Sequence, residues 1–379
     1  MEKLNDKKTF REALRFLKLK LIDVYIIRKF LGTFFFCIVL ILTIAVVFDF
    51  AEKIDNFMEK QAPVKAIIFD YYLNFIPYFA MLFAPLFVFI AVIFFTSKMA
   101  ISTEIIAILN SGMSFRRMML PYFLSALFIA SFTFALTNFV IPKSNRIRME
   151  FEDKYYHAST KRITVENIHR QVSKNVYVYM GTFNPLSQRG QNFTIEKFND
   201  KGELESKLSS SSVVYDTTLH KWSALNYYLR VTNANGEIIT KGKQIDTTLN
   251  AMRPEDFSRD PSFVGTMTSR ELDNYIKLLR LQGSDELKLF LIEKYRRFSN
   301  PFAVFILTLI GVTLSSRKIR GGLGMNIGIG LMLSFSYILF LQFASQFSLK
   351  GSLGPMLAMW IPNIIYAVIG MVLYKLAPK

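Results

Sequence analysis

The chain combines 379 residues, a hydrophobic content of 51% and a formal net charge of +17, with 46 Lys and Arg against 29 Asp and Glu. A soluble domain with so large an apolar fraction would not normally carry this many basic residues, so the two properties are expected in different parts of the chain. The composition excludes a single ordinary soluble domain and favours a membrane protein with basic segments outside the bilayer.

Six apolar runs are candidates for membrane-spanning helices. Four of them come close to the roughly 20 uncharged residues that a spanning helix needs; they are 30–48, 118–141, 323–347 and 355–374. A shorter fifth run, 298–316, has basic pairs on both sides. Run 66–95 contains Pro77 and Pro85 and is too long for one upright span and too short for two, so we expect one tilted helix with a proline kink. The sequence thus predicts an α-helical membrane protein with six transmembrane helices.

The basic residues indicate the orientation of these spans. Segment 1–29 carries nine Lys and Arg, and the three basic residues of 317–322 have no acid beside them. The loop 49–65, by contrast, balances its lysines with four acids. Because loops rich in Lys and Arg stay on the cytoplasmic side, both termini and the loop 97–117 are expected in the cytoplasm.

The N-terminal segment also has an amphipathic pattern. Phe10, Leu14, Leu17 and Leu21 share one helical face, with basic residues beside them. This pattern suits a helix on the anionic inner leaflet, but a solvated basic tail explains it equally well.

A large insertion, 142–297, follows the third span and is expected outside the cytoplasm. It contains short alternating segments separated by Asn, Gly, Asp and Ser, which indicate an antiparallel sandwich or β-jellyroll-like domain; these segments are 176–183, 191–198, 211–217, 221–231 and 236–242. Residues 268–298 then predict two helices broken at Gly283, the first with a capping box formed by Thr268 and Glu271. The fold class is therefore a helical membrane protein with an inserted all-β domain.

Residue types that carry out catalysis or bind metals are scarce. Cys37 is the one cysteine, the three histidines have no ligand spacing, and no phosphate-binding loop of the G-x-x-x-x-G-K-[ST] type occurs. Gly324 and Gly328 are four residues apart and would let a helix approach closely, either for packing or as a mobile interface. We therefore expect no catalytic residue and no metal site.

Five stretches, in their order and spacing, carry a resemblance to a known family. They are 22–34 (IDVYIIRKFLGTF), 104–114 (EIIAILNSGMS), 268–283 (TSRELDNYIKLLRLQG), 320–331 (RGGLGMNIGIGL) and 360–370 (WIPNIIYAVIG). Over nearly its whole length beyond the N-terminal tail, the chain resembles the lipopolysaccharide-export permeases of the LptF/LptG family.

This resemblance implies a place in an ATP-binding-cassette exporter of the bacterial inner membrane. The partners would be a cytoplasmic ATPase dimer, a second permease chain that is identical or related, periplasmic jellyroll bridge proteins of the LptC/LptA kind, and lipopolysaccharide. ATP and Mg would be used by the ATPase, while the permease would bind no cofactor and no nucleic acid. Other possibilities are a permease for another lipid or for lipoproteins, and a membrane scaffold that transports nothing.

The resemblance also gives the loop between the second and third spans a role. A coupling helix at about 102–111, with Ser102 or Thr103 as N-cap and Gly112 at its end, would rest in a groove of the ATPase. Its contacting residues would be Glu104, Ile105, Ile108, Leu109 and Gly112. The alternative is an interfacial helix whose apolar side chains lie in lipid.

The remaining expectations concern the substrate path and the domain boundaries. A gate for the lipid is expected between the first and fifth spans; its residues would be Leu31, Ile38, Gly324, Ile327 and Gly328. The predicted organisation is a basic segment 1–29, three spans in 30–141, a periplasmic domain 142–297 and three spans in 298–379.

Overall fold

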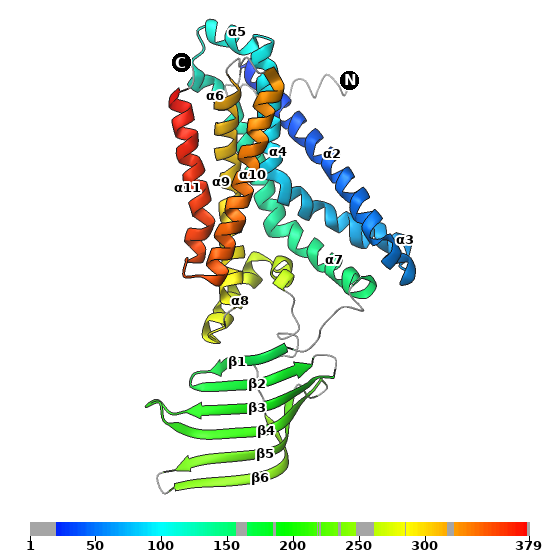
Figure 1. Ribbon diagram of the computed structural model, residues 1–379, viewed down its shortest axis with the longest axis vertical. Helices are drawn as coiled ribbons and strands as arrows, with labels where there is room; N and C mark the ends of the chain where they lie inside the picture. The colour runs from blue at the N-terminus through cyan, green and yellow to red at the C-terminus, as the bar shows by residue number, and fades with distance from the viewer. Residues whose placement is uncertain are drawn as a thin grey trace, which may run out of the picture. The chain divides into compact units, whose positions relative to one another are not determined.

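A computed structural model describes most of the chain. The described residues are 20–156, 165–184, 187–217, 219, 221–233, 236–247, 261–284, 286–316 and 322–376. They belong to two compact units, one formed by Met1–Tyr156 with Ile292–Lys379 and the other by His157–Leu291 (Figure 1). The proposed amphipathic pattern of 1–19 and the basic residues of 317–320 lie outside the described residues.

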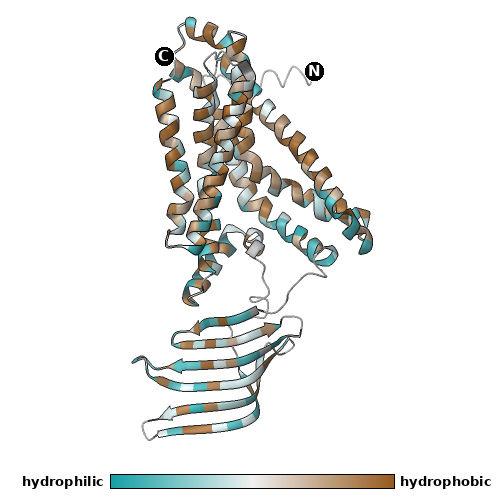
Figure 2. Cartoon of the chain, in the orientation of Figure 1, coloured by the Kyte–Doolittle hydropathy of each residue, from teal (hydrophilic) through white to brown (hydrophobic). Residues whose placement is uncertain are grey.

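The first unit contains long apolar helices (Figure 2). Among the described residues, six helical stretches are long and apolar enough to cross a membrane, as predicted. They are α2 (Leu21–Glu59), the run Val64–Ile101, the run Phe115–Tyr155, α9 (Leu287–Ser315), α10 (Gly322–Lys350) and α11 (Pro355–Leu376). A helix satisfies its own backbone hydrogen bonds, which is what the hydrocarbon requires of a spanning segment.

Two of these spans are built from several helical segments. The second joins α3 (Val64–Ala66), the π-helical η1 (Ile67–Tyr72) and α4 (Leu73–Ile101), and so forms the single helix that the sequence predicts, with both prolines inside α4. The third joins α6 (Phe115–Ala135), η2 (Leu136–Val140) and α7 (Ile141–Tyr155).

The helices extend beyond the apolar runs from which they were predicted. Polar residues continue α7 to Tyr155, and α9 starts at Leu287. The boundaries predicted at 142 and 297 therefore fall inside helices, and the second compact unit covers the shorter range His157–Leu291.

The centre of the first unit is α4, which packs on α2, α7 and α10. Phe95 of α4 stacks on Tyr122 of α6 with ring centroids 5.3 Å apart, and Phe30 of α2 lies 5.7 Å from Phe95. Polar contacts fix the same helices: the hydroxyls of Thr96 and Tyr122 are 3.1 Å apart. Aromatic packing and buried hydrogen bonds together set the register of these spans.

An ion pair joins the starts of α2 and α6. The Asp23 carboxylate is fully buried and accepts two hydrogen bonds from the Arg117 guanidinium, one of them 2.7 Å long. Asp23 also accepts a hydrogen bond from the backbone N–H of Lys20, 2.8 Å away. A buried carboxylate with this many donors stays charged and fixes the two helix ends to each other.

The second unit contains a six-stranded antiparallel sheet in sequential order. Its strands are β1 (Val165–Ser173), β2 (Val176–Asn184), β3 (Arg189–Phe198), β4 (Leu204–Asp216), β5 (Lys221–Asn233) and β6 (Gly236–Thr247). One face buries a core around Met180, Phe193 and Trp222. The all-β prediction is confirmed, and the described strands form a curved meander in which each strand pairs with its neighbour in the chain (Figure 1).

Two helices follow the sheet, as predicted. The 3₁₀ helix η4 (Pro261–Thr266) leads into α8 (Ser269–Leu281), which begins with the expected capping box: the Thr268 hydroxyl accepts from the Glu271 N–H, and Glu271 accepts from the Thr268 N–H at 2.9 Å. The chain then breaks at Gly283, whose φ is +59°. Leu272, Ile276 and Leu279 of α8 form a buried cluster with Phe290 at the start of α9.

The glycines of α10 have different surroundings. An added Cβ at Gly324 or Gly328 would meet nothing within 4 Å, whereas one at Gly330 would lie 2.2 Å from Cδ1 of Ile93 in α4. Gly330 is therefore the residue that lets α10 approach α4, and Gly324 and Gly328 do not pack against the rest of the described chain.

This difference predicts that a Gly→Leu substitution affects stability differently at positions 330 and 328. Gly330→Leu should destabilise the folded chain by about 1–3 kcal/mol through overpacking against buried Ile93, whereas Gly328→Leu should change its stability little. Thermal unfolding of both variants in detergent checks this. Equal effects on the melting temperature would contradict the packing of α10 on α4.

Candidate functional site

The loop between the second and third spans contains a short helix, α5 (Glu104–Asn110). It is shorter than the predicted 102–111. Thr103 occupies the N-cap position, but its φ is +61° and its hydroxyl donates to the backbone oxygen of Ser102 at 2.7 Å instead of capping the helix. The helix ends before Gly112, whose φ of +86° is a conformation that glycine adopts easily.

The apolar face of α5 points into the protein. Ile105 is 1% and Ile108 7% exposed, and both belong to the buried cluster formed by α2, α4 and α6, with Leu109 packed against it. The sequence assigned this face to a groove of a partner. The structure corrects that assignment, because the same side chains complete the core of this chain.

The outward face of α5 consists of different residues. Ile106 is 46% exposed, and Ala107 and Asn110 are exposed as well. Glu104 stands at the edge of this face, where it accepts hydrogen bonds from the Tyr25 hydroxyl at 3.0 Å and from Ser102 at 3.3 Å. Figure 1 shows α5 at the end of the helical unit where α11 also ends. The loop therefore presents a small surface with one acid at its rim.

The five predicted gate residues lie on two helices. Leu31 and Ile38 of α2 are half-buried against the cluster of α2, α4 and α6, and Ile327 of α10 is half-buried against a second cluster around Tyr337. Gly324 and Gly328 are exposed. The structure thus places these residues on two helices that both pack on α4.

The outer faces of these two helices are broad and apolar. In both α2 and α10, 22% of the most apolar stretch is buried, against 56% in the helix that contains α4. Val39 and Phe48 of α2 are 62% and 73% exposed, and Met332 of α10 is 74% exposed. Lipid or another membrane helix must cover such surfaces.

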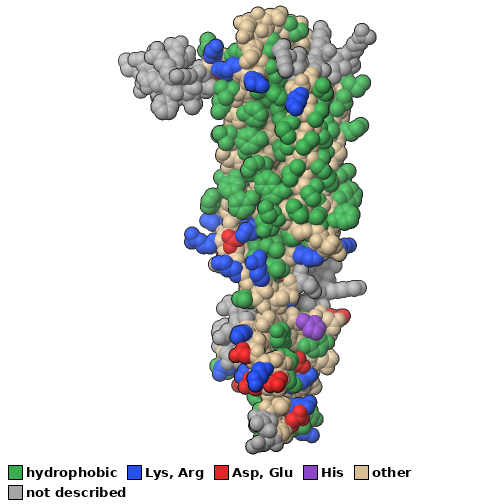
Figure 3. Space-filling view, turned by 90° about the vertical axis from the view of Figure 1, so that its left-hand side faces the viewer, with side chains coloured by type: hydrophobic (Ala, Val, Ile, Leu, Met, Phe, Trp, Pro, Cys, Tyr) green, Lys and Arg blue, Asp and Glu red, His purple; other side chains and the backbone are tan. Residues whose placement is uncertain are grey.

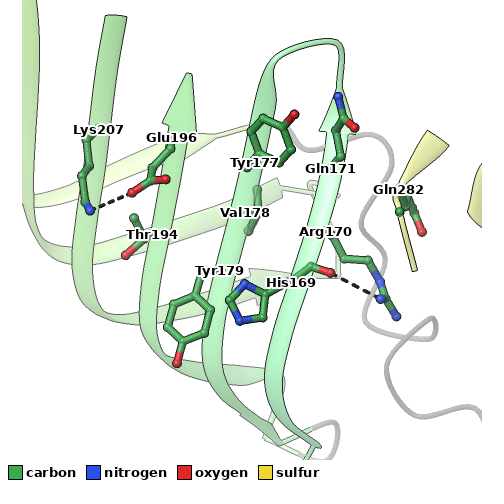
Figure 4. A pocket seen from close by; sticks show the side chains of 11 residues that line it. His169, Arg170, Gln171, Tyr177, Val178, Tyr179, Thr194, Glu196, Lys207 and Gln282 are labelled. Carbon is green, nitrogen blue, oxygen red and sulfur yellow. Dashed lines mark hydrogen bonds and ion pairs between the residues drawn. The ribbon is translucent and has the colours of Figure 1, made fainter. Parts of the chain in front are cut away.

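The sheet carries a hollow of about 490 Å³ that the sequence did not predict. It is lined by His169, Arg170, Gln171, Tyr177, Val178, Tyr179, Thr194, Glu196, Lys207, Gln282 and Gly283 (Figure 4). Tyr177, Glu196 and Lys207 form one cross-strand row, and Lys207 lies 2.7 Å from Glu196. The sequence feature that could have indicated this hollow is the spacing of Tyr177 and Tyr179 in β2: residues two apart in a strand lie on the same face of the sheet.

The charges in this hollow are paired within the unit. Arg170 donates to the Ser284 hydroxyl at 2.9 Å and lies 3.6 Å from Glu286. Figure 4 shows His169 beside Tyr179, with ring centroids 4.6 Å apart. This arrangement suits binding or packing, since the lining offers no nucleophile held by a general base. Among the described residues, no group of three or more His, Cys, Asp and Glu could hold a metal ion.

Six apolar helices and an antiparallel β domain inserted between the third and fourth of them define a multi-pass membrane protein with an inserted β domain. The chain matches the family described as "Lipopolysaccharide export system permease LptF/LptG" over residues 24–376, and it belongs to that family. A comparison with curated proteins finds no match. Family membership assigns the chain to lipopolysaccharide export as a transporter component rather than an enzyme, and to the inner membrane.

The placement of α5 can be tested by chemical labelling. In a Cys37→Ala background, Ile106→Cys and Asn110→Cys should react rapidly with a water-soluble maleimide, whereas Ile105→Cys and Ile108→Cys should react many times more slowly because the core covers them. The measurement is the rate of labelling in membranes opened to the reagent. Fast labelling at 105 and slow labelling at 106 would reverse the assignment of the two faces.

Proposed function

We propose that this chain is one of two permease subunits of an ATP-binding-cassette exporter that extracts lipopolysaccharide from the inner membrane and passes it to a periplasmic jellyroll bridge. The observation that carries the proposal is α5: a helix with one face in the transmembrane core and the other exposed in a loop between two spans. ATP and Mg would act in a separate cytoplasmic ATPase.

The coupling surface would be the exposed face of α5. Ile106, Ala107 and Asn110 would enter a groove of the ATPase, with Glu104 meeting a basic side chain at the rim. The positive-inside rule supports a cytoplasmic location for this loop and for both termini. Because Ile105 and Ile108 belong to one buried cluster with residues of α2, α4 and α6, a displacement of α5 by the ATPase would move these spans with it.

The lipid would enter along α2 and α10. Their exposed faces would meet the corresponding helices of a second permease chain, identical or related, and form a side opening for acyl chains. Gly324 and Gly328 support this role because they leave the surface of α10 open for an approaching helix or lipid. Their surroundings favour an interface over packing within the chain.

The β domain would continue the path on the periplasmic side. In β6, the last of the described strands of the sheet, nine of the twelve residues are exposed, with Ile238 and Ile239 at 58% and 61%. An exposed strand edge of this kind can pair with a strand of another protein through backbone hydrogen bonds. A jellyroll bridge protein would be the partner that extends the sheet.

Glu104→Arg tests the coupling surface. The change places a like charge against the basic residue expected on the ATPase; disrupting such a charge pair costs about 2–5 kcal/mol, enough to weaken binding tens-fold. Insertion and abundance should remain normal while ATPase co-purification and lipid export are lost. Tyr25→Phe is the matched control, because it removes the internal hydrogen bond of Glu104 and keeps the charge. If both variants retain the ATPase equally, α5 does not dock it through Glu104.

Photo-crosslinking tests the lipid path. A crosslinker at Val39 or Met332 should capture lipopolysaccharide in cells, because both side chains are exposed on the proposed opening. Leu127 of α6, 52% exposed, provides a control on another span. Capture of the glycolipid at 127 and not at 39 or 332 would exclude this path.

A further inference from the structure

A crevice of about 350 Å³ lies between α6, α9 and α11, apart from the coupling surface and the proposed gate. Its lining residues are Arg116, Met119, Leu120, Phe123, Leu309, Met371 and Tyr374. The starts and ends of the helices meet here, since the rings of Phe115 in α6 and Tyr374 in α11 lie 5.9 Å apart. The crevice therefore lies near the end of the helical unit that carries α5 (Figure 1).

The lining changes from polar to apolar along the helix axis. On α6 the order is Arg116, then Leu120, then Phe123; on α11 Tyr374 is followed, one turn deeper, by Met371. Leu120 is 42% and Met371 54% exposed. Figure 3 shows the same succession on one whole face of the helices, with an apolar band that ends at Lys and Arg side chains. If the apolar band lies in the bilayer, the apolar part of the crevice faces hydrocarbon, where an acyl chain can fill it.

Two hydrogen-bond donors at the polar end of the crevice have no acceptor among the described residues. Arg117 is engaged by Asp23, but its neighbour Arg116 is exposed and makes no ion pair or hydrogen bond with the rest of the described chain. The Tyr374 hydroxyl likewise has no hydrogen-bond partner in the described ranges, and exposed Lys375 follows it. A cation and a hydroxyl above an apolar crevice complement an acyl chain with a phosphate at its end.

We propose that this crevice binds an anionic glycerophospholipid of the leaflet on the α5 side, with one acyl chain between α6, α9 and α11 and the phosphate held by Arg116 and Tyr374. The leaflet follows from the position of Arg116 in the first turn of α6, shortly after α5, and only its designation as the cytoplasmic leaflet rests on the proposed function. The exported glycolipid is also an anionic amphiphile, but its proposed path runs along α2 and α10 instead. The bound phospholipid would fix the ends of three spans next to the coupling helix.

Native mass spectrometry of the purified chain tests the proposal. The chain is stripped with detergent and titrated with phosphatidylglycerol or phosphatidylcholine of the same acyl chains. Both lipids carry the phosphate, but the choline cation of phosphatidylcholine offsets its charge and is repelled by Arg116 and Lys375. Phosphatidylglycerol, with a net negative charge, should therefore be retained about tenfold more tightly, a difference of about 1.4 kcal/mol. Arg116→Gln should reduce its retention to the level of phosphatidylcholine. Leu120→Trp, which fills the crevice and keeps the charge, should reduce the retention of both lipids.

Arg28→Gln is the matched control, because Arg28 is exposed on α2, has no partner among the described residues and does not line the crevice. It should bind as the unchanged chain does. If Arg28→Gln and Arg116→Gln lose phosphatidylglycerol equally, exposed basic residues attract this lipid without a specific site. If Leu120→Trp retains both lipids as the unchanged chain does, the lipid only surrounds the helices and does not enter the crevice. Either result overturns the proposal.

Two further experiments distinguish a failure of this proposal from a failure of the proposed function. Lipopolysaccharide added in competition should not displace phosphatidylglycerol, and displacement would assign the crevice to the cargo. If Arg116→Gln releases an ATPase from membranes without changing lipid retention, the crevice is a protein contact and the proposal fails. The lipid titration itself contains no ATPase and no transport step, so its outcome is independent of whether the exporter assignment holds.

Discussion

The burial of Ile105 and Ile108 in the core of the transmembrane helices is the interaction on which the proposed mechanism depends. A helix of seven residues is too short to be stable alone in water, so its conformation must come from tertiary packing. The same packing makes α5 part of the buried cluster that α2, α4 and α6 share. In the proposed coupling, a force applied to the exposed face of α5 would reach these spans through Ile105 and Ile108.

The membrane unit separates a fixed interior from open surfaces. Around α4, stacked aromatic rings and the buried hydroxyls of Thr96 and Tyr122 hold the spans in one register. On α2 and α10 the apolar side chains face outward, and Gly324 and Gly328 leave the surface of α10 open. Such a division suits the proposed exporter, in which a stable core would carry the motion and the exposed helix faces would meet lipid and a second chain.

Local patterns in the sequence were enough for most of the fold. Apolar length gave all six spans, and the Thr268–Glu271 capping box gave the start of α8, because both depend on neighbouring residues alone. β1 was missed since its sequence, VENIHRQVS, alternates poorly. The site was only half predictable: periodicity groups Ile105 with Ile108 on one face, but it does not say whether that face meets a partner or the chain's own core. The same limit applies to the glycines, where only the three-dimensional neighbours single out Gly330.

The central claim, that the exposed face of α5 docks an ATPase, is tested most directly by photo-crosslinking at position 106 in intact cells. The account predicts capture of a single cytoplasmic nucleotide-binding subunit, with a yield that changes when ATP is depleted. A crosslinker at Met58, 74% exposed at the other end of α2, should not capture it. Capture of lipid alone at 106, or of the same subunit from both positions, would contradict the account.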